Sequence, residues 1–352
     1  GTGVAGALRE PERTAAAAIN DAAATVVAVD VPSGVDADTG ESTGVAVEAD
    51  RVVTFHDVKP GLADQDDVTV ADIGIPAAAE RFVGPGDLLA LDRPSDAHKG
   101  DFGRVMVVGG GPYTGAPALA ARAALRAGAD LAYVHAPAGV AREIQGYGED
   151  LIVNSYDGEH LRPAHVPDLL AAAADRDVVV LGPGLGEAAA TREAVAEFLA
   201  AYEGRAVVDA DALQVVPEVE TAATLVCTPH QGELVEMGGP SAEDWRERAD
   251  AVTAFARDVG HTLLVKGAYD VVSDGERTRV NRTGNPGMTV GGTGDVLAGA
   301  TGALLAVLDP LQAAAVGAYA NGAAGDAVAE DGYGLLASDL PDRLPAALWG
   351  ER

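Results

Sequence analysis

Four small residues directly before an acidic one stand out in the carboxyl-terminal part of the chain, where Gly291-Gly292-Thr293-Gly294 precedes Asp295. Glycines let the backbone turn tightly and aim several N–H groups at one point. Because the positive end of the following helix adds to them, such a turn can hold phosphate oxygens. An Asp at this place can accept a proton from a hydroxyl that attacks a phosphoryl group. The alternative is that Asp295 only caps the helix.

A lysine follows an apolar strand upstream of this turn, in the segment Lys266-Gly267-Ala268. Ligands of open α/β sheets bind at the carboxyl ends of strands, and a cation there suits a nucleotide phosphate. The chain has 24 Lys and Arg residues in total, and its three lysines are Lys59, Lys99 and Lys266. In a chain so poor in lysine, a ligand-binding role is favoured over a solvated residue at a strand end.

Three further turns follow apolar strands: the glycine-rich residues 182–186, the segment 209–213 with Asp209 and Asp211, and the segment 228–233 with His230 and Glu233. Taken singly, each could be an ordinary tight turn or a helix cap. Their common place at strand ends predicts one shared cleft.

A glycine-rich stretch also follows a strand at residues 109–116. It meets the dinucleotide-binding pattern only loosely, and no acidic residue ends the next expected strand, so this signal is weak.

The elements that must position these residues alternate between short β-branched runs and alanine-rich helical stretches, which is typical of an α/β protein with a mainly parallel sheet. The expected strands cover residues 25–30, 51–55, 104–108, 130–135, 177–181, 206–209, 224–227 and 262–266. The expected helices cover residues 116–127, 191–201, 242–258, 295–307 and 311–329. A domain boundary is expected between residues 75 and 91, where proline and glycine recur.

The charge of the chain excludes several classes of partner. Its 54 Asp and Glu against 24 Lys and Arg give a formal net charge of -30. A phosphate backbone and an anionic membrane surface both need a basic face, so neither is an expected partner. The hydrophobic content of 48% excludes an acidic disordered chain. So large an acidic excess suits a salt-rich cytoplasm, where the Debye length of about 3 Å at 1 M salt screens self-repulsion.

The remaining composition fits a reducing interior. The single Cys227 allows no disulfide within the chain. No secretory signal is visible, and the apolar runs are too short or too interrupted for a membrane span, so a cytoplasmic protein is expected. The chain begins with Gly1 inside a motif, which predicts a fragment of a longer protein.

Together these segments resemble the NAD(P)H-hydrate dehydratase family, whose members have a ribokinase-like fold. The resemblance covers residues 95–330 and rests on the ordered segments HKGDFGRVMVVGGG, YTGAPALAARAALRAGADL, VVLGPGLG, VVDADAL, CTPHQGE, LLVKGAYD and NRTGNPGMTVGGTGD. It implies a three-layer sandwich around a mainly parallel sheet. It also implies repair of a damaged cofactor, in which NADH hydrate or NADPH hydrate is dehydrated at the expense of ADP or ATP.

The resemblance also implies roles for individual residues. Asp295 would be the base, and the N–H groups of Gly292, Thr293 and Gly294 would hold the transferring phosphoryl group. The nucleotide would bind Gly294 and the loop formed by Lys266, Gly267, Ala268, Tyr269 and Asp270. The hydrate pocket would be lined by Ala116, Gly184, His230 and Asp295. Mg²⁺ is expected for phosphoryl transfer, and a homo-oligomer is expected from the alanine- and glycine-rich helices.

Residues 1–76 resemble a second family, the NAD(P)H-hydrate epimerases, through GTGVAGALR, AVDVPSGVDADTG, ADRVVTFHDVKPGL and VADIGIP. By this resemblance, Gly1, Thr2, Gly3 and Asp30 would bind substrate and Ser33 would bind K⁺. The catalytic Asp of that family would precede Gly1, so no epimerase activity is expected from these 352 residues, although the longer parent is expected to interconvert the R and S hydrates. The predicted division is residues 1–85, the carboxyl-terminal half of a Rossmann-like epimerase domain, and residues 86–352, the dehydratase domain.

Two other functions stay open. A ribokinase-like kinase of a small alcohol, such as a vitamin precursor or a sugar, would use the same base, Asp295, and the same turn at residues 291–294, called the phosphate turn below. A module that binds NAD-type ligands without turnover would show nucleotide binding but no consumption of ADP. A stable phosphorylated product identifies the first, and binding without phosphate release identifies the second.

Overall fold

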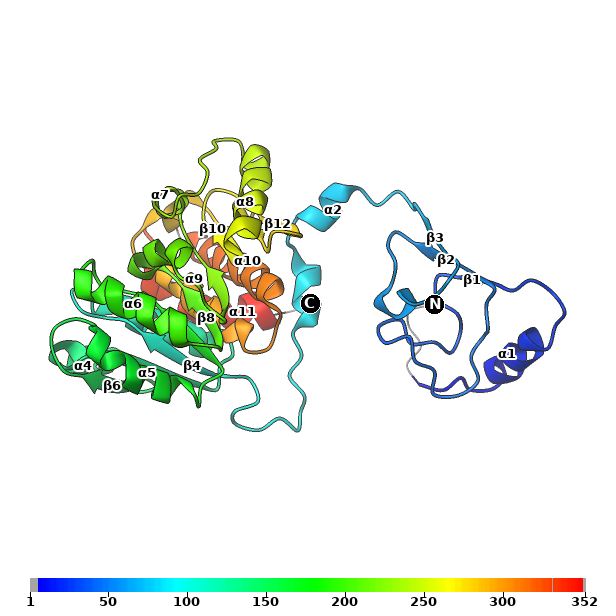
Figure 1. Cartoon of the computed structure of the whole chain (residues 1–352), viewed down its shortest axis with the longest axis horizontal. Coiled ribbons are helices and arrows are strands. Elements are labelled where there is room, and N and C mark those ends of the chain that lie inside the picture. The colour runs from blue at the N-terminus through cyan, green and yellow to red at the C-terminus, as the bar shows by residue number, and fades with distance from the viewer. Residues whose placement is uncertain (1–5, 331, 351–352) are drawn as a thin grey trace. The chain divides into compact units, whose positions relative to one another are not determined.

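The computed structural model describes residues 6–330 and 332–350. The chain divides into two compact units, the first ending at Ala79 and the second beginning at Glu80. Figure 1 labels many of their helices and strands, which are numbered in chain order. Gly1, Thr2 and Gly3, which the epimerase resemblance assigns to substrate binding, lie outside the described residues.

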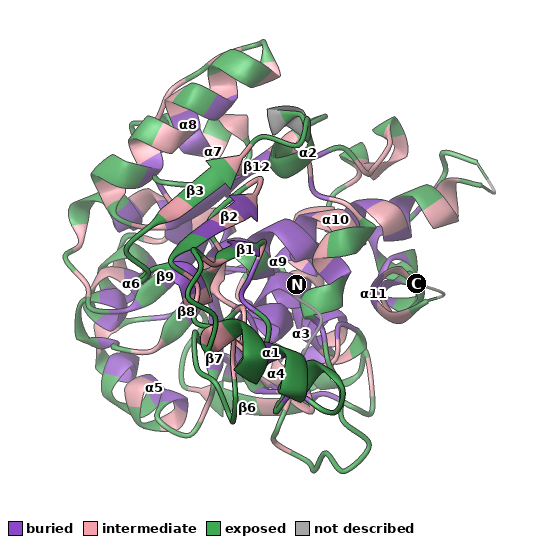
Figure 2. Ribbon diagram, turned by 90° about the vertical axis from the view of Figure 1, so that its right-hand side faces the viewer, coloured by how far each residue is buried: buried purple, intermediate pink, exposed green. Residues whose placement is uncertain are grey.

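The first unit is built on a small parallel sheet in the order β1-β2-β3. Its elements are α1 (Glu12–Asn20), β1 (Val27–Val29), β2 (Arg51–Phe55) and β3 (Val68–Ala71), and α2 (Ala77–Arg81) spans the boundary between the units. Ala28, Val31, Val52 and Leu62 form its hydrophobic core. Helix α1 presents mostly exposed residues (Figure 2).

The second unit contains a nine-stranded sheet in the order β12-β11-β10-β9-β8-β7-β4-β5-β6. The pairs from β10 through β6 are parallel, whereas β11 pairs antiparallel with both β10 and β12. The strands are β4 (Arg104–Val108), β5 (Leu131–Pro137), β6 (Ile152–Tyr156), β7 (Val178–Leu181), β8 (Arg205–Val208), β9 (Thr224–Cys227), β10 (Thr262–Val265), β11 (Asp270–Ser273) and β12 (Thr278–Asn281).

Helices cover both faces of this sheet. They are α3 (Gly115–Arg126), α4 (Ala138–Gln145), α5 (Val166–Ala173), α6 (Ala189–Ala201), α7 (Gln231–Glu236), α8 (Trp245–Val259), α9 (Thr293–Leu305), α10 (Pro310–Ala329) and α11 (Leu344–Trp349). Alternate residues of β4 belong to different cores: Val105 and Val107 pack with α3, α9 and α10, whereas Met106 and Val108 pack with α5, α6 and α8. This confirms the predicted three-layer sandwich.

Helix α9 lies inside the molecule, as its burial in Figure 2 makes plain. Every residue from Val296 to Leu305 is buried. A helix that is apolar on all sides is stable only when it is enclosed, and α9 packs against strands β7 and β8 and against its neighbours α3 and α10. The turn that begins α9 is therefore held by the core.

The eight expected strands and five expected helices all form, with shifts of up to three residues at their ends. All five helix starts are shifted, and two of these shifts bear on the caps. Helix α8 begins at Trp245 rather than at residue 242 because Asp244 caps it, its carboxylate accepting from the backbone N–H groups of Arg246 and Glu247. Helix α9 begins at Thr293, two residues before the expected start.

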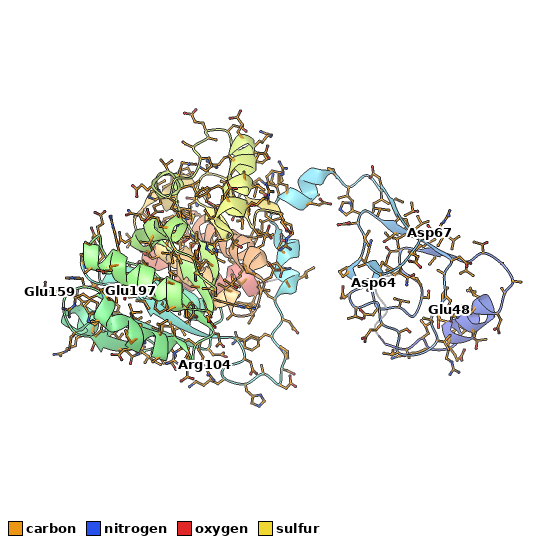
Figure 3. All side chains as sticks on the ribbon, viewed as in Figure 1. Glu48, Asp64, Asp67, Arg104, Glu159 and Glu197 are labelled. Carbon is orange, nitrogen blue, oxygen red and sulfur yellow. The ribbon has the colours of Figure 1, made fainter. Side chains whose placement is uncertain are left out.

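Acidic side chains project from both units, as Figure 3 illustrates for Glu48, Asp64, Asp67, Glu159 and Glu197, which are all exposed. In the described part of the chain, no helix combines the length and apolar character that a membrane span needs.

Candidate functional site

Four of the turns identified in the sequence lie next to one another at the carboxyl ends of the parallel strands. They follow β7, β8, β9 and β10, which are consecutive neighbours in the strand order and run parallel, so their carboxyl ends point the same way. A bridge between His230 and Lys266 joins the last two turns, and the N–H of Lys266 donates to Pro229 O over 2.8 Å. The four turns thus share one location, and the cleft expected there stays a prediction.

The turn before α9 depends on glycine. Gly292 is the N-cap residue with a φ of 99°, and a Cβ there would lie 2.8 Å from the Cβ of Ala337 and 2.9 Å from Leu119 Cδ1. The hydroxyl of Thr293 donates to Met288 O at 3.0 Å and to Val290 O at 3.2 Å, which fixes the turn to the preceding loop.

Asp295 is the third residue of α9, not its cap. Because Gly292 occupies the N-cap position, the alternative that Asp295 serves only as a cap is wrong. Burial raises the pKa of Asp295 to about 7, and the carboxylates of Asp209, Asp211 and Glu233 add to this rise, whereas Lys266 opposes it. A carboxylate with a pKa near neutrality is suited to accept a proton during a reaction.

Lys266 lies within an acidic cluster at the strand ends. Its Nζ is 3.0 Å from Asp209 Oδ1 and 3.6 Å from Glu233 Oε2, and its side chain is 20% exposed. Burial alone would lower the pKa of Lys266, but these two carboxylates raise it above the ordinary value, so the ammonium stays charged. A solvated lysine at a strand end does not describe this residue.

Asp209, the partner of Lys266, is also buried and hydrogen-bonded. Its side chain is only 3% exposed, and its Oδ1 accepts from Thr228 Oγ1 at 2.8 Å as well as from Lys266. The pair lies under the phosphate turn, because a Cβ on Gly294 would come within 3.2 Å of Lys266 Nζ and 3.9 Å of Asp209 Oδ2. Asp209 and Thr228 lie in turns that the sequence predicts, but the sequence assigns no role to either residue. Their position at the ends of adjacent strands was the available signal.

The expected nucleotide loop forms a closed turn from Lys266 to Asp270. Asp270 Oδ1 accepts from the N–H of Gly267 at 2.9 Å, and Asp270 Oδ2 accepts from Asn281 Nδ2 at 2.9 Å. Burial raises the pKa of Asp270 above its usual value. Ala268 and Tyr269 are exposed at the tip of the turn.

Of the residues expected to line the hydrate pocket, Ala116 and Gly184 lie together. Gly184 has a φ of 73°, and a Cβ there would be 2.5 Å from Tyr113 O and 3.2 Å from the Cβ of Ala116. His230 lies apart from these two, in the turn between β9 and α7. It caps α7 by accepting at Nδ1 from the N–H groups of Gly232 and Glu233. Its proton in the neutral form is then on Nε2, and the ring is 59% exposed.

The weak dinucleotide signal at residues 109–116 has a packing explanation. A Cβ on Gly109 would lie 2.3 Å from Pro183 O, and the N–H of Gly110 donates to that same oxygen at 2.9 Å. These glycines allow close approach of the turn after β7.

The first unit also has an acidic residue directly after a parallel strand. Asp30 follows β1 with a φ of 71°, and its Oδ1 lies 3.1 Å from Lys59 Nζ. Ser33 is exposed, and its carbonyl accepts from the N–H of Val47 at 2.8 Å. Within residues 6–330 and 332–350, no group of three or more His, Cys, Asp and Glu side chains is arranged to hold a metal ion.

Comparison with protein families gives two matches. Residues 105–346 match the model described as NAD(P)H-hydrate dehydratase, and residues 1–61 match the model described as the YjeF-related protein N-terminus.

Curated relatives match along nearly the whole chain. The bifunctional NAD(P)H-hydrate repair enzyme Nnr of Pyrobaculum aerophilum is 47% identical over 99% of this chain and 72% of its own length. The enzyme of the same name from Archaeoglobus fulgidus is 44% identical over 99% of this chain and 74% of its own length.

Solved structures match in fold. A ribokinase-like superfamily protein from Enterococcus faecalis has a TM-score of 0.68 and 25% identity, covering 78% of this chain and 97% of its own. The ADP/ATP-dependent NAD(P)H-hydrate dehydratase of Bacillus subtilis, co-crystallised with ATP and Mg²⁺, has a TM-score of 0.66 and 25% identity, covering 78% of this chain and 99% of its own. The ribokinase-like fold is confirmed, and the chain belongs to the NAD(P)H-hydrate dehydratase family of nicotinamide nucleotide repair enzymes.

Proposed function

We propose that this chain dehydrates the S form of NADH hydrate or NADPH hydrate to NADH or NADPH, driven by ADP or ATP, with Asp295 as the base. The observation that carries this assignment is the match of residues 105–346 to the dehydratase family, with Asp295 placed directly after the phosphate turn. Burial and the neighbouring charges of Asp209 and Lys266 set the pKa of this carboxylate at about 7. Such a group is a proton acceptor at neutral pH, next to a place where phosphate oxygens can be held.

The reaction begins with transfer of a phosphoryl group to the hydrate. The hydroxyl oxygen attacks the terminal phosphorus of the nucleotide while Asp295 takes its proton, and the bond to the departing nucleotide breaks, which releases AMP from ADP. The N–H groups of Gly292, Thr293 and Gly294 hold the phosphoryl oxygens during this step, as electrostatic stabilisation requires. Lys266, kept charged by Asp209, lies beside Gly294 and adds a cation.

Elimination then restores the ring. The carbon–oxygen bond to the phosphate breaks, inorganic phosphate departs, the neighbouring ring carbon loses a proton to water, and the double bond re-forms. Phosphorylation is useful because hydroxide is a poor leaving group and phosphate is a good one. Ala116, Gly184 and His230 are proposed to line the hydrate pocket, and the loop Lys266–Asp270, including Gly267, Ala268 and Tyr269, to bind the nucleotide.

The carboxylates at the carboxyl ends of these strands fit Mg²⁺ in its usual mode of binding. Mg²⁺ keeps several waters and is held by one or two carboxylates together with substrate phosphates, rather than by a cage of protein ligands. Asp209 and Glu233, which flank Lys266, are the candidate carboxylates. When bound, the ion would neutralise charge that develops on the transferring phosphoryl group.

The test is regeneration of NADH from chemically hydrated NADH, followed by its near-ultraviolet absorbance, in the presence of ADP and at high salt. Asp295→Asn should abolish the signal. Asp168→Asn is the matched control, because Asp168 is likewise the third residue of a helix, α5, but is exposed. No regeneration by the unaltered chain, or equal rates for Asp295→Asn, would refute the assignment. A stable phosphorylated product would instead indicate a kinase of small alcohols.

For the amino-terminal part we propose that it belongs to an NAD(P)H-hydrate epimerase domain. The predicted division gives residues 1–85 to that domain and residues 86–352 to the dehydratase. We place residues 80–85 with the dehydratase instead, because the second compact unit begins at Glu80. Asp30 would contact the substrate, and Ser33 would be a ligand of K⁺. The support is the family match over residues 1–61 and the position of Asp30 directly after β1.

We propose a salt-rich cytoplasm as the environment of this protein, because its surface is strongly acidic. Exposed acidic side chains on both units and a net charge of -30 suit a salt-rich cytoplasm, because screening there reduces self-repulsion. We also propose a homo-oligomer. Thermal unfolding and light scattering over a series of salt concentrations test both statements: stability should rise with salt, and the mass should exceed that of one chain.

A further inference from the structure

The segment of residues 80–91, called the connector below, is attached to the free edge of the nine-stranded sheet. Strand β12 is the edge strand, and Phe82 forms a parallel bridge with its residue Val280. The N–H of Val83 donates to Val280 O over 3.0 Å, and the side chain of Val83 is buried. The connector is therefore part of the folded second unit.

An ion pair fixes the connector at a second point. Arg279, also in β12, places Nη2 2.8 Å from Asp87 Oδ1 and donates from the same nitrogen to Phe82 O at 3.1 Å. Asp87 in turn accepts from the N–H of Gly84 at 2.8 Å. The backbone on both sides of Phe82 is thus held, which leaves its ring in a defined place.

Phe82 begins a row of three aromatic rings, Phe82, Trp245 and Tyr269, called the aromatic row below. The centroids of Phe82 and Trp245 are 5.5 Å apart with planes tilted by 54°, and those of Trp245 and Tyr269 are 5.5 Å apart with planes at 21°. Arg282 lies over Phe82 at 4.0 Å and Arg246 over Trp245 at 4.4 Å. Aromatic pairs and cation–π contacts of this kind stabilise a fixed ring geometry.

The aromatic row ends in the proposed nucleotide loop. Tyr269 is an exposed residue of that loop, and its carbonyl accepts from Arg248 Nη2 at 2.7 Å. Arg248 belongs to α8, the helix that begins with Trp245. The edge strand reaches the same loop by another route, because Asn281, the neighbour of Val280, donates to Asp270.

We infer that Phe82 is a positioning residue for the nucleotide: through Trp245 it fixes the ring of Tyr269 as a stacking surface for the purine base of ADP. This inference rests on the proposed function, since it takes the loop Lys266–Asp270 as the nucleotide site. An exposed ring held from behind by a second ring loses little freedom when a flat base stacks on it. Phe82 lies outside the segment that matches the dehydratase family, residues 105–346.

The test uses the full chain and compares Phe82→Ala with Leu89→Ala, which removes an exposed side chain from the same connector. Phe82→Ala should raise the KM for ADP about threefold to tenfold, the effect of one aromatic pair, while kcat and the KM for the hydrate stay within about twofold. Phe82→Tyr should restore the KM, because it keeps the ring. Leu89→Ala should change none of these values.

Tryptophan fluorescence gives a readout that does not depend on turnover. The chain has two Trp residues, so a Trp349→Phe background leaves Trp245 as the reporter. ADP should change its emission, and Phe82→Ala should weaken the apparent affinity by the same factor as the KM.

Two outcomes overturn the inference. One is a folded Phe82→Ala variant, judged by its melting temperature, that binds ADP as the unaltered chain does. The other is equal weakening by Leu89→Ala. If Phe82→Ala does not fold, Phe82→Leu keeps the apolar volume without the ring and is judged by the same criteria. A chain that binds ADP but does not dehydrate the hydrate refutes the proposed function alone.

Discussion

The two units differ most in how their parallel strands are covered. In β1 of the first unit, Ala28 is buried, whereas Val27 and Val29 are 51% and 60% exposed. In β4 of the second unit, every residue from Val105 to Val108 is buried, because helices cover both faces of the sheet. Parallel sheets are normally enclosed on both sides. Most of the stabilising apolar burial therefore belongs to the second unit.

A second comparison concerns charge. Each unit places an Asp after a parallel strand and pairs it with one of the three lysines: Asp30 with Lys59 at 3.1 Å, and Asp209 with Lys266 at 3.0 Å. Asp209 is nearly inaccessible, whereas Asp30 is partly exposed. Only the buried pair lies beside a second titrating carboxylate, Asp295, whose pKa it affects. The same pairing thus has a stronger electrostatic effect where water is excluded.

The largest expected effect comes from Asp295→Asn in the second unit. Loss of a general base should lower kcat for dehydration about 10²- to 10⁴-fold. The variant should also melt at a higher temperature at neutral pH and above. A carboxyl whose pKa is raised from 3.8 to about 7 lowers the stability of the fold progressively as the pH rises between these two values, and asparagine avoids this loss. Rate and melting temperature are measured on one preparation, with Asp168→Asn as the control. A lower melting temperature would contradict the burial of this charge.

The next effect separates the two ion pairs. Lys266→Met leaves the buried Asp209 carboxylate without its partner, which should cost about 3–5 kcal/mol of stability and most of the activity. Lys59→Met leaves Asp30, which water reaches, and should cost less than about 1 kcal/mol with unchanged dehydration. Urea unfolding and steady-state rates measure both. Equal losses in the two variants would remove the distinction between the pairs.

Substitutions in the two hydrophobic cores test how far the units differ in the burial of their strands. Leu62→Ala and Leu263→Ala should each cost about 2–5 kcal/mol, since both side chains are almost fully buried. In the first unit, with its four-residue core, this loss should unfold the unit and leave dehydration intact; in the second it should lower the melting temperature of a unit that stays folded. Calorimetry with an activity assay checks this. An inactive Leu62→Ala variant would show that the first unit supports the dehydratase site.

The smallest expected effect is a shift in the pH profile. Asp295 must be ionised to act as base, so kcat/KM should rise with pH through about 7, the pKa to which burial raises this group. Asp209→Asn removes a negative charge that raises that pKa and frees Lys266 to lower it. The rise should therefore move to lower pH. Thr228→Val, which removes only the hydrogen bond to Asp209, should move the profile less, and no shift in either variant would contradict the coupling.

Several elements could not be read from the sequence. Strand β6 was missed because it lies at the sheet edge and is largely exposed, so it lacks a continuous apolar run. Strands β11 and β12 contain only two and one apolar residues, so neither has a continuous apolar run, although the turn between them contains Asp274-Gly275, which favours a hairpin. Strand β3 has no fully buried residue. Strands such as β7 and β10 can be predicted, although they are short, because burial on both faces requires a continuous apolar run.

What the sequence determined by itself was the order of the glycine turns, the strands that carry them and the family to which the chain belongs. Spacing also placed Asp295 after the phosphate turn. The tertiary structure decided which charges meet: Asp209 and Lys266 are 57 residues apart, and their contact requires β8, β9 and β10 to lie side by side. The pKa of Asp295 depends on this meeting, because burial and neighbouring charges are properties of position in space and not of position along the chain.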